Sequence, residues 1–171
     1  MGVSRLREFI ANNKVLFDKA FFVVQFLCFL HLKNNTHIST VVLTSGPSML
    51  PTLNITADLL LAERLSHRFG KVEPGDIVLV RSPVAPRKVV TKRVIGMEGH
   101  SMTYVVDPNS SDRCETIVVP KGHLWVQGDN IYASTDSRRF GPVPYGLLEG
   151  KVFWRIWPPK DFGPLEKELD K

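Results

Sequence analysis

The strongest constraint on the fold is a series of short apolar runs, each ended by glycine, proline or a polar turn, that begins near Ile38. Runs of this length between turn signals are typical of β-strands, and their repetition along the chain is typical of an all-β domain. The 171 residues are enough for one hydrophobic core. We therefore expect a mainly β fold. The expected strands are Ile38–Leu43, Leu59–Glu63, Asp76–Arg81, Val89–Ile95, Ser101–Val106, Thr116–Val119, His123–Gln127 and Lys151–Trp157.

The N-terminal segment differs in composition, because Phe21–Leu30 is the only strongly apolar stretch of the chain. A helix over Ala20–Leu32 would rise about 20 Å, which is less than the roughly 30 Å of a hydrocarbon core. Extending the helix back to Val15 gives nearly the needed length but brings Asp18 and Lys19 to an interface. The segment is therefore either a membrane anchor or a helix that packs in a core or on a partner.

These observations divide the chain into three parts. Residues 1–36 are expected to hold the short apolar helix, residues 37–160 the β domain, and residues 161–171 a polar C-terminal tail.

One expected strand contains a lysine among valines. In an extended strand, Val90, Lys92 and Val94 share one face, whereas Arg93 points to the other. Burial beside valines disfavours the ammonium form and lowers the pKa of a lysine, so Lys92 is a candidate general base. Arg93 is not, because a guanidinium stays protonated in proteins. The alternative is that Lys92 reaches water from a half-buried edge strand.

A candidate nucleophile for such a base is Ser48, which lies in the run Thr44–Thr52. A serine hydroxyl is a poor nucleophile at neutral pH unless a partner takes its proton, and a neutral lysine amine is able to do so. The combination predicts a serine nucleophile with a lysine base.

Three motifs in this order resemble those of type I signal peptidases. They are Gly46–Thr52, then Lys92–Gly96, then Gly128–Asn130 followed by Ser134–Arg138. Each motif alone is a weak signal, but their order and spacing together are specific. The resemblance covers roughly residues 40 to 158 and implies a signal-peptidase-like catalytic domain built from a β-barrel or sheet.

Within that family the pattern is most similar to the mitochondrial inner membrane peptidase, and to its subunit 1 type. The narrower resemblance rests on the sequences of Ser45–Leu53 and Val152–Pro159. It implies a heterodimer with a related second peptidase subunit at the mitochondrial inner membrane, with the catalytic domain facing the intermembrane space. A thylakoid or bacterial-type signal peptidase and a catalytically silent scaffold subunit of such a complex stay open as alternatives.

The resemblance assigns roles to individual residues. Ser48 matches the nucleophile and Lys92 the general base, while Ser134 matches a serine that hydrogen-bonds the lysine amine and orients it. Gly46 stands where many bacterial relatives have a serine that helps to hold the oxyanion. A hydroxyl donor is therefore missing, and the backbone N–H of Ser48 is left to fill this role.

The remaining matched residues are supporting ones. Asp129, Asp136 and Arg138 match positions that brace the site, where a buried Asp–Arg pair is a sensible arrangement. We interpret Ser137 and Arg139 as ordinary loop residues.

The composition argues against some classes of ligand. The cysteines and histidines lack metal-ligand spacing, so we expect no metal and no cofactor. The positive charges, which give a formal net charge of +5, are dispersed rather than clustered with aromatic residues. This pattern argues against nucleic-acid binding and is compatible with contact to an anionic lipid surface. If the chain is a peptidase, we expect precursor proteins to bind with their presequences extended along a sheet edge.

Overall fold

The computed structural model describes residues 39–64, 72–110, 113–165 and 167. The chain divides into two compact units, Met1–His37 and Ile38–Lys171. The predicted apolar helix within residues 1–36 lies outside the described residues. In the part of the chain that the structure describes, no helix has the length and apolar character needed to cross a membrane.

The prediction of a mainly β fold is confirmed, since each of the eight expected runs forms a strand. The structure starts one of them at Cys114 rather than Thr116, and begins the long ninth strand at Leu148 rather than Lys151. The strands are β1 (Ser39–Thr44), β2 (Asp58–Glu63), β3 (Ile77–Arg81), β4 (Val89–Met97), β5 (Ser101–Val105), β6 (Cys114–Val118), β7 (His123–Gln127), β8 (Val143–Pro144), β9 (Leu148–Trp157) and β10 (Gly163–Pro164). Short helical turns are η1 (Pro47–Met49), α3 (Ser137–Phe140), η2 (Tyr145–Leu147) and η3 (Pro159–Asp161).

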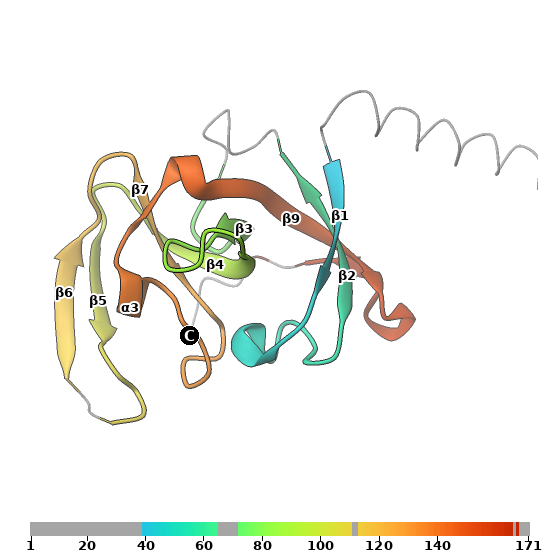
Figure 1. Ribbon diagram of the computed structural model, residues 1–171, viewed down its shortest axis with the longest axis horizontal. Coiled ribbons are helices and arrows are strands. Elements are labelled where there is room, and N and C mark those ends of the chain that lie inside the picture. The colour runs from blue at the N-terminus through green and yellow to red at the C-terminus, as the bar shows by residue number, and fades with distance from the viewer. Residues whose placement is uncertain (1–38, 65–71, 111–112, 166, 168–171) are drawn as a thin grey trace, which may run out of the picture. The chain divides into compact units, whose positions relative to one another are not determined.

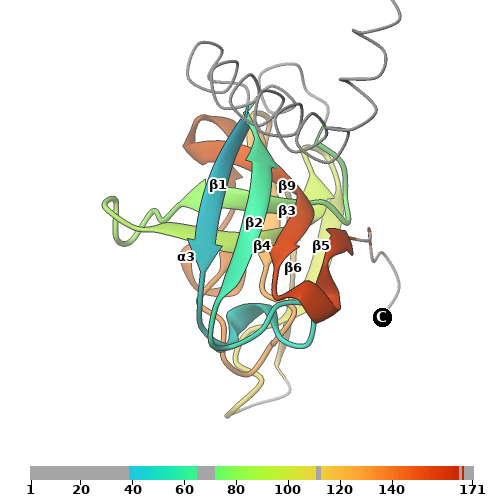
Figure 2. The same cartoon turned by 90° about the vertical axis from the view of Figure 1, so that its right-hand side faces the viewer.

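Eight of these strands form one antiparallel sheet in the order β1-β2-β9-β3-β4-β7-β8, with β10 paired to β9, while β5 and β6 pair separately (Figure 1). The sheet is strongly curled, so that β1 and β2 run across the direction of β3 and β4 (Figure 2). The long β9 joins these two parts because it pairs with β2 along one edge and with β3 along the other.

The burial patterns follow from positions in the sheet. β2 alternates buried and half-buried residues, as a strand with one covered face does. β3 is buried from Ile77 to Val80 because apolar clusters cover both of its faces. Val78 and Val80 belong to one cluster, and Ile77 and Leu79 belong to the other.

The C-terminal end of the described chain contacts the sheet. β10 pairs with Trp154 and Arg155 of β9, Leu165 packs against the second cluster, and Lys167 forms an ion pair with Glu73. The predicted domain boundary after residue 160 stays a prediction.

Close packing of β9 against the end of β2 generates a test of the sheet. A Cβ at Gly150 would lie 2.7 Å from the backbone oxygen of Glu63, which has little freedom to move. We expect Gly150→Ala to lower the free energy of unfolding by about 1–3 kcal/mol through overpacking. The control is Gly146→Ala, since a Cβ there meets nothing within 4 Å. Urea unfolding of both variants checks the difference, and equal stability would contradict this packing.

Candidate active site

Ser48 lies in a tight loop directly after β1. The loop begins at Gly46, whose φ of 116° is a conformation that favours glycine, and continues into the η1 turn. The Gly46 N–H donates to the carbonyl of Ile55 at 3.0 Å, so residues 46 to 55 form a closed loop. The Ser48 N–H belongs to the first turn of η1, where such groups have no acceptor within the helix.

Two apolar side chains fix this loop to the domain. Met49 and Leu53 are each 2% exposed and belong to the second core cluster, and the Leu53 N–H donates to the carbonyl of Met49 at 2.8 Å. The half-buried Ser48 is therefore carried by a segment with its own buried anchors.

A cleft of about 230 Å³ borders the loop. One wall is formed by the end of β1 and the residues that follow it, and the other by the start of β4 with Leu79 of β3. The lining residues are Val42, Leu43, Thr44, Ser45, Gly46, Ser48, Met49, Leu53, Asn54, Leu79, Val89, Val90 and Thr91.

Lys92 is buried in the middle of the sheet. β4 pairs with β3 on one side and β7 on the other, and Lys92 is 3% exposed opposite Val78. The alternative in which this lysine reaches water from an edge strand is therefore wrong. Burial lowers the pKa of Lys92 below its ordinary value, against the opposing effect of Asp136.

The Lys92 amine is hydrogen-bonded to Ser134. Its Nζ donates to Ser134 Oγ at 2.9 Å, and a hydrogen bond from Ser134 helps to lower the pKa of Asp136. Lys92 thus donates toward Ser134, so that in the neutral amine the lone pair is left for another proton.

Asp136 and Arg138 form the expected buried pair. Arg138 Nε and NH2 donate to the two carboxylate oxygens at 2.9 and 2.7 Å, and Gly128 N donates to one of them at 3.0 Å. Burial alone would raise the pKa of Asp136, but these hydrogen bonds hold it below the ordinary value. Asp136 is also the N-cap of α3, which fixes its backbone.

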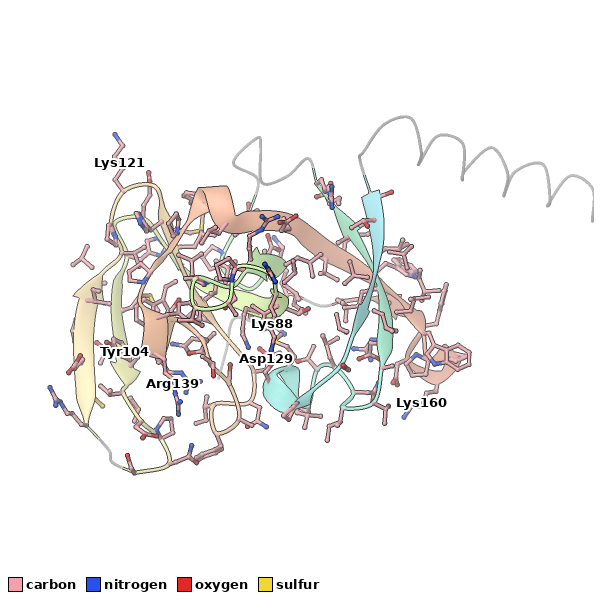
Figure 3. All side chains as sticks on the ribbon, in the orientation of Figure 1. Lys88, Tyr104, Lys121, Asp129, Arg139 and Lys160 are labelled. Carbon is pink, nitrogen blue, oxygen red and sulfur yellow. The ribbon has the colours of Figure 1, made fainter. Side chains whose placement is uncertain are left out.

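Asp129 forms a second pair, with Arg93. Arg93 Nε and NH2 donate to its two carboxylate oxygens at 2.8 Å each, and Thr52 Oγ1 donates at 2.5 Å. Asp129 therefore lies between the loop of Ser48 and β4 (Figure 3). Asp129 thus links Thr52, four residues after Ser48, to Arg93, which is adjacent to Lys92 in the sequence.

Backbone contacts bring the three motifs together. Asn130 N donates to the carbonyl of Ser48 at 3.1 Å. A Cβ added at Gly128 would collide with both that carbonyl and Ser134 Oγ. Ser48, Gly128 and Ser134 are therefore packed around one point, and Ser134 holds Lys92.

Three contributors to the site are not predicted from the sequence. Arg93 is considered there only as a base and Thr52 only as the end of a motif, yet both bind Asp129. The interpretation of Ser137 as an ordinary loop residue is wrong, because it is 1% exposed and its hydroxyl accepts from Val126 N at 3.0 Å. A second charge on a buried strand was a usable signal for Arg93, since buried arginines are normally paired.

Within the described ranges, no group of three or more His, Cys, Asp or Glu residues is placed to hold a metal ion.

The buried amine should cost stability. Below the ordinary lysine pKa of 10.5 the unfolded chain binds a proton more readily than the folded chain, so the folded state is disfavoured there. We expect Lys92→Met to raise the free energy of unfolding at neutral pH by about 0.5–2 kcal/mol. The gain should shrink as the pH rises toward 10.5. Lys88→Met, at an exposed lysine four residues earlier, is the control. Urea unfolding across pH checks this, and a destabilised Lys92→Met variant would contradict it.

Comparisons with known proteins agree with the motif pattern. Residues 17–108 and 105–157 match the family described as signal peptidase, peptidase S26. The mitochondrial ATP-independent inner membrane protease subunit 1a of Arabidopsis thaliana is 54% identical, with 95% of this chain and 96% of that protein covered. The mitochondrial inner membrane protease subunit 1 of Mus musculus is 43% identical, with 87% of each covered.

Further matches are to a subunit 2 type and to a solved structure. The mitochondrial inner membrane protease subunit 2 of Saccharomyces cerevisiae is 36% identical, with 75% of this chain and 74% of that protein covered. A crystal structure of a signal peptidase I from Enterococcus faecalis matches with a TM-score of 0.40 and 26% identity, covering 46% of this chain and 94% of that one. Because the family match and the two subunit 1 relatives extend over most of its length, the chain belongs to the signal peptidase family, peptidase S26.

Proposed function

We propose that the chain is a serine endopeptidase of the mitochondrial inner membrane that removes sorting presequences, with Ser48 as nucleophile and Lys92 as general base. The observation that carries this proposal is the buried Lys92 amine, whose pKa is lowered and whose Nζ donates to Ser134 beside the loop of Ser48. Near neutral pH a larger fraction of such a lysine is neutral than of a solvated one, and only the neutral amine is able to take a proton.

The proposed reaction has two stages. Lys92 Nζ takes the hydroxyl proton of Ser48 as Oγ attacks the scissile carbonyl carbon, and the same proton then passes to the leaving amine as the peptide bond breaks. Water attacks the resulting ester with Lys92 again as base, which releases the acid and restores Ser48. The oxyanion formed in each stage accepts a hydrogen bond from the Ser48 N–H, since Gly46 supplies no hydroxyl.

The substrate in this proposal is an extended peptide. The cleft beside Ser48 lies between the end of β1 and the start of β4, and β1 is an edge strand with one side unpaired in the described sheet. Main-chain hydrogen bonds to such an edge give affinity, and the cleft, which is lined by both apolar and polar residues, accepts side chains near the cut.

The compartment and partner rest on the relatives. Their names place them at the mitochondrial inner membrane and include both a subunit 1 and a subunit 2 type. We therefore propose that the catalytic domain faces the intermembrane space and that this chain pairs with a related second subunit.

Loss of the nucleophile tests the activity. Purified chain, with and without a related second subunit, is incubated with precursor proteins, and new N-termini are sequenced. We expect Ser48→Ala to lower cleavage by roughly 10⁴-fold or more while the fold is kept. Ser101→Ala, at an exposed position of β5, should cleave like wild type. Processing by the Ser48 variant would exclude the Ser/Lys assignment.

The protonation state of Lys92 predicts the pH profile. Because only the neutral amine accepts a proton, kcat/KM should rise with pH and level off at a pH below the ordinary lysine value of 10.5, as the lowered pKa requires. Lys92→Arg keeps the charge but cannot lose its proton, so it should be inactive, whereas Lys88→Arg at an exposed position should be active. A flat profile or an active Lys92→Arg enzyme would remove Lys92 from the mechanism.

A further inference from the structure

The loop that carries Ser48 also contacts β9. Arg155 of β9 is 8% exposed, and its NH2 donates to the backbone carbonyl of Thr52. The side chain of the same Thr52 donates to Asp129, as described above. The side chain of Thr52 is therefore bound by Asp129 and Arg93, and its backbone carbonyl is bound by Arg155.

Arg155 is itself placed by two carboxylates. Its NH1 lies 3.4 Å from Asp161 Oδ2 in η3, and its Nε lies 4.0 Å from Asp58 Oδ1 at the start of β2. Asp58 is fully buried, and Asp161 is a third exposed. The guanidinium is thus directed by two carboxylates that lie outside the loop of residues 46 to 55.

The same carboxylates hold a residue that lines the cleft. Asn54 Nδ2 donates to Asp58 Oδ1 at 2.9 Å and to Asp161 Oδ2 at 3.1 Å, and its backbone N donates to Asp58 Oδ2 at 2.6 Å. Thr52 and Asn54 are therefore both tied to one polar cluster, which we define as Asp58, Arg155 and Asp161.

Stability alone does not account for this cluster. The Arg155 Nε is buried and has no hydrogen-bond partner among the described residues. A buried donor without a partner costs free energy, so an apolar side chain would serve packing better. The Nη2 group, by contrast, donates to the loop of Ser48, and Nη1 faces the carboxylate of Asp161.

We propose that Arg155 and Asp161 are positioning residues for Ser48: they hold the Thr52 carbonyl and thereby the distance between the Ser48 hydroxyl and the Lys92 amine. This inference rests on the proposed function of the same site. Its energetic basis is that a displacement of about 1 Å at a reacting atom costs on the order of 10²-fold in rate. The short η3 turn after β9 is then part of the support of the site.

Two conservative variants test the proposal. Arg155→Lys keeps the charge but loses the planar donors, and Asp161→Asn keeps the shape but loses the charge that orients Arg155. We expect kcat to fall by roughly 10- to 100-fold in Arg155→Lys and by less in Asp161→Asn. The pH at which kcat/KM levels off should be unchanged, because Lys92 is untouched. Lys160→Ala is the matched control, since this exposed lysine lies 3.9 Å from the same Asp161 oxygen.

Hydrogen exchange provides a readout that does not require activity. The amides of Gly46 and Leu53, which are hydrogen-bonded within the loop, should exchange faster in both variants, while those of β3 and β4 should be unchanged. If Arg155→Lys fails to fold, Asp161→Asn carries the test, because its partly exposed side chain makes a fold defect less severe.

The outcomes separate the two proposals. If wild type and Ser48→Ala both fail to cleave every precursor, the proposed function is wrong, and the exchange rates still decide whether this cluster holds the loop. If wild type cleaves and both variants keep its kcat, the positioning role is wrong. The positioning role is also wrong if the amides of Gly46 and Leu53 exchange no faster in both variants than in wild type.

Discussion

Burial of the Lys92 amine is the interaction on which the rest of the site depends. Desolvation lowers the pKa of Lys92, but Asp136 and Asp129 are close enough to raise it again. Each of these carboxylates is bound at both oxygens by an arginine, Arg138 or Arg93, which balances its charge. Without these arginines the carboxylates would stabilise the ammonium form of Lys92 and oppose its proposed role as a base. The two pairs therefore let the desolvation of Lys92 prevail.

The Asp136–Arg138 and Asp129–Arg93 pairs also fix the positions of the segments that carry them. One pair joins residues close in sequence, and the other joins residues far apart. Asp136 and Arg138 are neighbours in one short segment, so this pair orders the turn that carries Ser134. Arg93 and Asp129 are 36 residues apart, and their pairing joins a central strand to the loop before α3. The first pair orders the segment of Ser134, which accepts a hydrogen bond from Lys92, and the second ties the strand of Lys92 to the loop that holds Ser48.

This difference explains what the sequence could predict. The strand pattern, the valines around Lys92 and the closeness of Asp136 to Arg138 are local features, and local features are readable from spacing. Whether β4 is an edge or a central strand depends on which strands pair with it, and one strand's pattern does not contain that information. The contact of Thr52 with Asp129 spans 77 residues, and that of Ser137 with Val126 requires α3 to fold back on β7. These contacts exist only once the sheet is assembled.

The curl of the sheet turns such long-range contacts into a site. β4 supplies Arg93, and β9 supplies Arg155 from its C-terminal end, which pairs with β2. β2 runs across the direction of β4 (Figure 2). Both arginines nevertheless reach Thr52, because the curl brings their strands around one loop. In a flat sheet, with β3 between β9 and β4, two side chains from those strands would point in parallel rather than converge. The position of Ser48 relative to Lys92 is thus set by the shape of the whole sheet rather than by the loop itself.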